Sequence, residues 1–156
     1  MDGDREARRA PPRTGAVALC EVRGHSGLGV IRAMVHVHPS VLIIDDNRDI
    51  RESFQSLLRF EGYAVETAEN GREALSRLYG GLRPCIITLD LRMPLMSGLE
   101  FRREQLNHPE FAHIPVIVFS AGDELQQMER LHAEACLQKP VPPDQLLALL
   151  RKHCLK

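Results

Sequence analysis

The stretch that decides the fold reads Val41-Leu42-Ile43-Ile44-Asp45-Asp46, a compact apolar run that ends on two acidic residues. Two later stretches, Ile87-Thr88-Leu89-Asp90 and Leu137-Gln138-Lys139-Pro140, also run from apolar residues to a charged group. Short apolar runs without alternation are typical of strands buried on both faces, as in a parallel sheet covered by helices. The three stretches therefore predict strands whose charged ends lie at one edge of a sheet.

Helical periodicity alternates with these strands from Val41 onward. Apolar residues recur at helical spacing up to Gly62, and Asn70 is placed as the N-cap of a second helix that ends at Gly80. In the helix after Gly98 we expect Leu99 and Leu106 to face the core. Further strands are predicted at 63–67, 85–89, 115–119 and 135–138, and a last helix after them.

Five strands that alternate with helices indicate an α/β fold. We predict a single-domain, doubly wound (βα)5 parallel sheet of the flavodoxin-like type, with strand order 2-1-3-4-5. In such sheets a ligand binds beyond the carboxyl ends of the strands, at the point where the strand order reverses. The charged ends of the three strands are expected to meet there.

Composition sets broad limits on function. The chain has 156 residues, 44% of them hydrophobic, and a formal net charge of −1, so it lacks the basic field that drives nucleic-acid binding. No apolar run approaches the ~20 residues of a transmembrane helix. We expect residues 1–39 to be a disordered extension, because they show no sustained period, and residues 40–156 to form the folded domain.

The cysteines suggest a reducing compartment. Cys20, Cys85, Cys136 and Cys154 are far apart, with no C-x-x-C pair and no histidine at zinc-finger spacing. We interpret them as incidental reduced thiols of a cytoplasmic protein. From the near-neutral charge and the lack of a long apolar run, we expect neither a membrane nor a nucleic acid as a partner.

Five polar residues are expected at the functional edge: Asp45, Asp46, Asp90, Ser120 and Lys139. Three adjacent carboxylates repel one another unless a cation joins them, and Mg²⁺ suits a site with few carboxylates and several retained waters. Lys139 supplies a fixed positive charge, and Ser120 a hydroxyl donor, for a phosphoryl oxygen. Asp90 stands alone at its strand end and is the better nucleophile. The pattern therefore predicts phosphoryl transfer onto a carboxylate, which needs no general base.

From about Ser40 onward, the sequence resembles the receiver domain of bacterial two-component response regulators. The resemblance rests on the acidic pair after 41–44, on Asp90-Leu91-Arg92-Met93-Pro94-Leu95-Met96-Ser97-Gly98, on Phe119-Ser120-Ala121 and on Lys139-Pro140. It implies that Asp90 takes a phosphoryl group from a phosphohistidine of a sensor kinase or a histidine phosphotransfer protein.

The resemblance also assigns the remaining roles. Asp46 and Asp90 would bind Mg²⁺ directly, the backbone carbonyl of Arg92 would be the third protein ligand, and Asp45 would act mainly through water. Lys139 would pair with the phosphoryl group and Ser120 would move towards it. The family further implies a cis peptide bond between Lys139 and Pro140.

Two departures from the family pattern concern signal output. Cys136 occupies the position, three residues before Lys139, where the family usually has a tyrosine or phenylalanine that turns inward on phosphorylation. Only 19 positions separate Ser120 from Lys139, fewer than usual, so we expect a shortened fourth helix.

The leading hypothesis is a stand-alone phosphoacceptor switch. Only 17 residues follow Lys139, enough for one helix, so we expect action by protein–protein contact without a DNA-binding output domain. Such a protein is not an enzyme beyond catalysing its own phosphorylation and dephosphorylation. Two alternatives remain open: a pseudo-receiver that binds partners without phosphorylation, and a Mg²⁺-dependent aspartyl-phosphate hydrolase. The hydrolase pattern is Asp-x-Asp, whereas here Asn47 stands two residues after Asp45.

Overall fold

The predicted sheet is present in the computed structural model, which describes residues 16–22, 31–122 and 131–154. Five parallel strands lie in the order β4 (Ala64–Ala68), β3 (Ser40–Ile44), β5 (Ile86–Asp90), β6 (Val116–Ser120) and β7 (Ala135–Gln138). Counted within the domain, this is the order 2-1-3-4-5. The α/β class, the doubly wound topology and the strand order are therefore confirmed.

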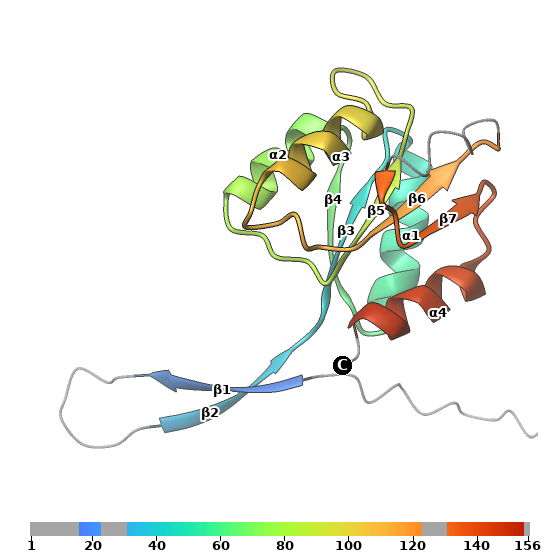
Figure 1. Cartoon of the computed structure of the whole chain (residues 1–156). Coiled ribbons are helices and arrows are strands. Elements are labelled where there is room, and N and C mark those ends of the chain that lie inside the picture. The colour runs from blue at the N-terminus through green and yellow to red at the C-terminus, as the bar shows by residue number, and fades with distance from the viewer. Residues whose placement is uncertain (1–15, 23–30, 123–130, 155–156) are drawn as a thin grey trace, which may run out of the picture.

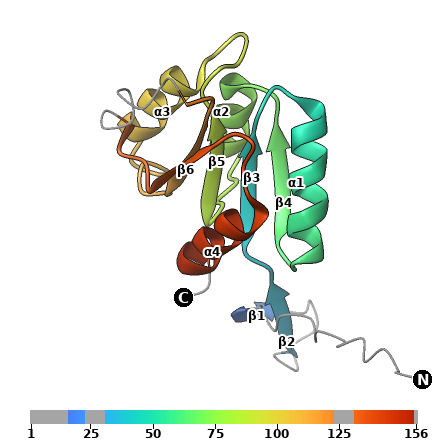
Figure 2. The ribbon, with the colours of Figure 1, turned by 90° about the vertical axis from the view of Figure 1, so that its right-hand side faces the viewer.

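Helices cover both faces of this sheet (Figures 1 and 2). α1 (Arg48–Phe60) and α4 (Pro143–Cys154) lie on one face, and α2 (Gly71–Tyr79) and α3 (Gly98–Asn107) lie on the other. Alternate residues of each strand serve the two cores: Ile43 packs with Leu58 and Leu146, whereas Ile44 packs with Leu78 and Phe101. The absence of polar alternation in the strands thus follows from burial on both sides.

The register of the strands brings the functional residues to one edge. Ile44 pairs with Leu89, so the residues that follow them, Asp45 and Asp90, leave the sheet side by side. On the far side of β5, Ser120 at the end of β6 pairs with Gln138, the last residue of β7 before Lys139. The carboxyl edge of the sheet therefore collects all of the predicted side chains.

Polar caps start three of the helices close to this edge. Asn47 accepts hydrogen bonds from the backbone N–H groups of Asp49 and Ile50, and Asn70 caps α2 as predicted, accepting from Glu73 N–H. Ser97 and Glu100 form a reciprocal capping box at the start of α3. These caps satisfy the first amide groups of α1, α2 and α3.

The amino-terminal segment differs from the expectation of disorder. β1 (Ala16–Val22) and β2 (Ile31–Val37) form an antiparallel pair in which Ala16 faces Val37, and residues 38–39 lead from β2 into β3. The prediction of disorder is therefore wrong for these two strands, and the rest of 1–37 lies outside the described residues.

Two further expectations are corrected. Leu99 and Leu106 are only half-buried, whereas Phe101, Arg102 and Gln105 form the buried face of α3. This face contains polar side chains that bond to backbone carbonyls, so it has no simple apolar period. Cys85 and Cys154 are joined in a disulfide and are not incidental thiols, because α4 returns its last residue to the start of β5.

The predicted fourth helix falls mostly on residues 123–130, which lie outside the described residues. Within the described part of the chain, no helix is long and apolar enough to span a membrane.

Candidate phosphoacceptor and metal site

Three carboxylates converge where β3 and β5 end. One oxygen from each of Asp45, Asp46 and Asp90 lies within 4.8 Å of the others. Asp45 is 1% exposed and Asp90 6%, while Asp46 is open to solvent. The pocket is thus anchored by two buried acids and has one acid at its mouth.

Lys139 bridges the two buried acids. Its Nζ lies 3.0 Å from Asp45 Oδ2 and 3.2 Å from Asp90 Oδ1. The bond between Lys139 and Pro140 is cis, as the resemblance implied. One ammonium group offsets only one of the three carboxylate charges, so the pocket retains an excess of negative charge.

The electrostatics of the pair follow from burial. Loss of solvent raises the pKa of Asp90 above its usual value; the nearby Lys139 opposes this and the Asp45 charge adds to it. Burial alone would lower the pKa of Lys139, but its hydrogen bond to Asp45 and the charges of Asp45 and Asp90 outweigh it, so that pKa is raised. Lys139 therefore stays cationic at neutral pH and can face an anionic group.

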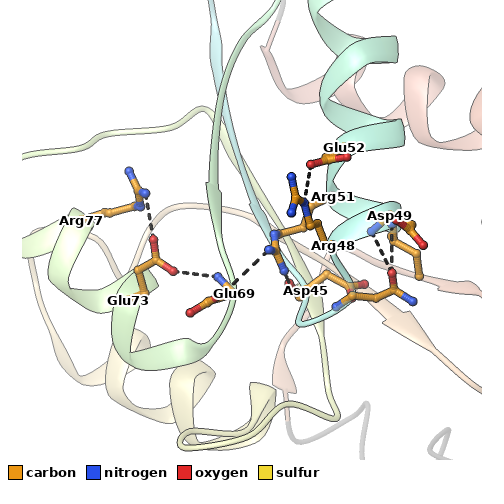
Figure 3. A network of polar contacts seen from close by, with 10 residues as sticks. Asp45, Arg48, Asp49, Arg51, Glu52, Glu69, Glu73 and Arg77 are labelled. Carbon is orange, nitrogen blue, oxygen red and sulfur yellow. Dashed lines mark hydrogen bonds and ion pairs between the residues drawn. The ribbon is translucent and has the colours of Figure 1, made fainter.

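A second network holds the backbone at Asp45 from the side of α1 and α2 (Figure 3). Arg51 Nη1 donates to the backbone carbonyl of Asp45 at 2.7 Å, and its Nη2 lies 3.9 Å from Glu69 Oε2. Glu73 accepts from the Glu69 backbone N–H at 2.9 Å and pairs with Arg77 at 2.8 Å. The end of β3 is thus held by charges from two helices and the β4–α2 loop.

Hydrogen bonds also order the two acids themselves. Asp45 Oδ1 accepts from the Asn47 backbone N–H at 2.9 Å, and the Asp90 carboxylate accepts from the backbone N–H of Arg92. These bonds orient the carboxylates of Asp45 and Asp90.

Ser120 lies at the neighbouring strand end, as predicted. It is 1% exposed, and its Oγ accepts the backbone N–H of Gly122 at 3.0 Å. Arg92 is exposed and follows Asp90 by two residues. Its carbonyl as a metal ligand stays a prediction. Cys136 is half-buried in β7 and packs against the core on the α2–α3 face.

The structure adds two residues that were not singled out in the sequence. Asn47 contacts Asp45 and caps α1, and Arg51 holds the Asp45 carbonyl. An Asn directly after an acidic strand end and before a helical run is an N-cap signal that could have identified the first. Arg51 has no comparable signal, because its role depends on the return of the helix across the strand end.

The comparisons with known proteins decide the family. A model described as the response regulator receiver domain matches residues 41–151. This chain belongs to the receiver domain family. Its members are signalling switches rather than classical enzymes, and the chain is thus a receiver domain of a two-component response regulator.

Relatives and solved structures agree with this assignment. The response regulator MprA of Mycolicibacterium vanbaalenii is 39% identical over 114 residues, covering 71% of this chain and 48% of that protein. The chemotaxis protein CheY4 of Vibrio cholerae superposes with a TM-score of 0.68 at 31% identity, covering 75% of this chain and 99% of CheY4. The receiver domain of sensor histidine kinase PA1611 from Pseudomonas aeruginosa has a TM-score of 0.70 over 77% of this chain and all of that domain, and at 22% identity it supports the fold alone.

Proposed function

We propose that this receiver is a phosphoacceptor switch in which Asp90 takes a phosphoryl group from a phosphohistidine of a sensor histidine kinase or a histidine phosphotransfer protein. The observation that carries the proposal is the contact of Lys139 Nζ with both Asp45 and Asp90. It places a cation beside the one carboxylate that ends the central strand, where a phosphoryl oxygen would need it.

The residues divide the work of the transfer. An oxygen of the Asp90 carboxylate attacks phosphorus, the bond from phosphorus to the histidine nitrogen breaks, and its electron pair stays on the imidazole. Lys139 holds its charge against the transferred phosphoryl oxygens, and Ser120 turns its hydroxyl towards them in place of its contact with Gly122. Because a carboxylate is already a nucleophile, no group has to remove a proton.

The donor set fits a divalent cation. Three carboxylates share the pocket, with one ammonium to oppose them, and oxygen is the donor that Mg²⁺ prefers. Asp45, Asp46 and Asp90, together with the backbone carbonyl of Arg92, would hold the ion. When bound, Mg²⁺ supplies neutralisation of negative charge on the phosphoryl oxygens.

The acceptor itself is tested by substitution. With Mg²⁺ and acetyl phosphate, we expect the protein to gain the mass of one phosphoryl group and Asp90→Asn to gain none, since an amide cannot form the acyl phosphate. Asp144→Asn removes an exposed carboxylate from the first turn of α4 and serves as the matched control. Intact-mass measurement after a brief incubation shows whether the native protein and each variant have gained the phosphoryl group.

Two outcomes would contradict this assignment. One is a native protein that stays unlabelled although its circular dichroism shows it folded. The other is labelling of Asp90→Asn to the native extent, which would place the phosphoryl group elsewhere.

Removal of the mouth carboxylate tests the metal site. We expect Asp46→Asn to weaken Mg²⁺ binding by about tenfold or more, since a directly bound carboxylate contributes charge and a ligand atom, with ~1.4 kcal/mol for each factor of ten. Asp46 is exposed, so its loss should leave stability nearly unchanged. Calorimetric titration measures the affinity, with the exposed Glu104→Gln on α3 as control. Equal affinities in native protein and Asp46→Asn would remove Asp46 from the ligand set.

How the receiver passes its signal to a downstream partner stays a prediction. The chain spans about half the length of the curated relatives it matches. Action through protein–protein contact is proposed from the receiver fold itself, and binding of the native protein but not Asp90→Asn to a partner after phosphorylation would support it.

A further inference from the structure

The disulfide joins two ends of the fold that are distant in sequence. Cys85 directly precedes β5, and Cys154 is the last residue of α4, 69 positions later. Their Cα atoms are 5.3 Å apart, within the range in which a disulfide forms without backbone movement. The bond therefore connects the final turn of the C-terminal helix to the start of the strand that carries Asp90.

Other contacts hold the body of α4 but secure its last turn less firmly. Leu146, Leu147 and Leu150 are buried in the core that the helix covers. Beyond them, Arg151 lies 3.6 Å from Glu61, and His153 lies 3.8 Å from Glu134; one partner of each pair, Arg151 or Glu134, is exposed. Pairs of this kind contribute little to stability. The sulfur bond is thus the one strong link at this end among the described contacts.

The surroundings of both cysteines are compatible with the disulfide and with the reduced thiols. Cys85 and Cys154 are half-buried rather than enclosed, so neither residue is sealed in the core, and thiol–disulfide exchange depends on such access. Cys85 Sγ also lies 3.1 Å from the backbone oxygen of Ser40. In the reduced protein, the Cys85 thiol can donate a hydrogen bond to this oxygen, so opening of the bond leaves that group with a partner.

We propose that Cys85 and Cys154 form a redox-responsive crosslink that fixes the last turn of α4 to the sheet, as a second input separate from Asp90. The oxidised state holds the turn, and the reduced state releases it while the buried leucines keep the rest of the helix in place. The crosslink lies at the amino end of β5, whereas Asp90 lies at its carboxyl end, so the chemistry at one end does not require the other.

The exchange balances with a small-molecule disulfide, such as oxidised glutathione, as the oxidant. A thiolate of one cysteine attacks the reagent, forming a mixed disulfide and releasing one glutathione thiolate. The thiolate of the other cysteine attacks the protein sulfur of that mixed disulfide, closing the crosslink and releasing the second. Two protein thiols are oxidised, one glutathione disulfide is reduced to two thiols, and the two protons pass to the released thiolates or to water.

The redox proposal is tested on the whole 156-residue chain. Samples are equilibrated with oxidised or reduced glutathione, their free thiols are alkylated and counted by mass, and hydrogen exchange is followed over the last turn of α4. In native protein and in Cys136→Ser, oxidation should remove two alkylatable thiols, yield the peptide pair containing Cys85 and Cys154, and slow the exchange of these amides by about tenfold or more. Cys85→Ser and Cys154→Ser should exchange at the reduced rate in both buffers.

Several results would overturn the proposal. They are an unchanged thiol count in oxidised glutathione, peptide pairs that join Cys20 or Cys136 instead, or identical exchange of the last turn in both buffers. If a serine variant does not fold, comparison of reduced and oxidised native protein gives the same answer. Asp90→Asn should retain the full redox response, so a failure of the phosphorylation proposal and a failure of this one are separately visible.

Discussion

Gly98→Ala is expected to destabilise the domain by at least about 3 kcal/mol, because its new methyl group has no space to occupy. A Cβ at this position would lie 2.3 Å from the backbone oxygen of Asp90 and 2.8 Å from Leu91 Cα. Both are main-chain atoms, so relief requires the backbone at Asp90 and Leu91, or the first turn of α3, to move. Either movement would disturb the hydrogen bond from Gly98 N–H to Leu91 O, now 3.0 Å long.

A second glycine provides the control. Gly80, at the end of α2, has a negative φ of −71°, and a Cβ there would meet its nearest neighbours, Ser76 O and Arg77 O, at 3.3 and 3.4 Å. Gly80→Ala should change the free energy of unfolding by less than about 1 kcal/mol. Urea unfolding measures both variants, and acetyl phosphate labelling shows whether the Gly98→Ala site survives. A Gly98→Ala protein as stable as Gly80→Ala would mean that the loop after Asp90 adapts easily.

The edge of the sheet could be predicted because each feature is encoded locally. The apolar run before Asp45, the similar run before Asp90 and the Lys139-Pro140 pair each mark a strand end in the sequence. Parallel topology then places all strand ends at one edge, so the meeting of Asp45, Asp90 and Lys139 needed no long-range information beyond the strand order.

The features that escaped prediction depend on contacts between distant segments. Cys85 and Cys154 have no informative spacing, and their bond exists only because α4 crosses the sheet towards the start of β5. The pairing of β1 with β2 depends on a register across residues that show no clear period. Arg51 likewise acquires its role from the position of α1. In each case the pattern is a property of the packed molecule and not of a window of sequence.

The buried polar face of α3 is the clearest case. Arg102 is 4% exposed, and its guanidinium donates to Leu131 O and His132 O, each at 2.8 Å, and to Gln105 Oε1 at 2.7 Å. Gln105 in turn donates to Phe111 O and Ile114 O. A charged residue normally indicates a solvent-facing position, so the sequence pointed to Leu99 and Leu106 instead. The backbone carbonyls of Leu131 and His132 explain why the Arg102 guanidinium can be buried.

Arg102→Ala is expected to cost about 4 kcal/mol, because it removes three charge-assisted hydrogen bonds, two of them buried, and takes this donor away from their acceptors. Burial lowers the pKa of the Arg102 guanidinium, an effect that Glu134 partly offsets, so the native side chain is itself kept at some cost. The substitution also removes the link from α3 to the carbonyls of Leu131 and His132, which precede β7 and hence Lys139.

The matched variant is the next residue on the same helix. Arg103 is exposed, and Arg103→Ala should change stability by no more than about 0.5 kcal/mol. Arg102→Lys keeps the charge but offers one nitrogen instead of a planar fork, so its loss should fall between the two. Urea unfolding ranks the three variants. If Arg102→Ala and Arg103→Ala lose equal stability, the carbonyls at 131 and 132 find other donors, and the link from α3 to β7 does not depend on the arginine.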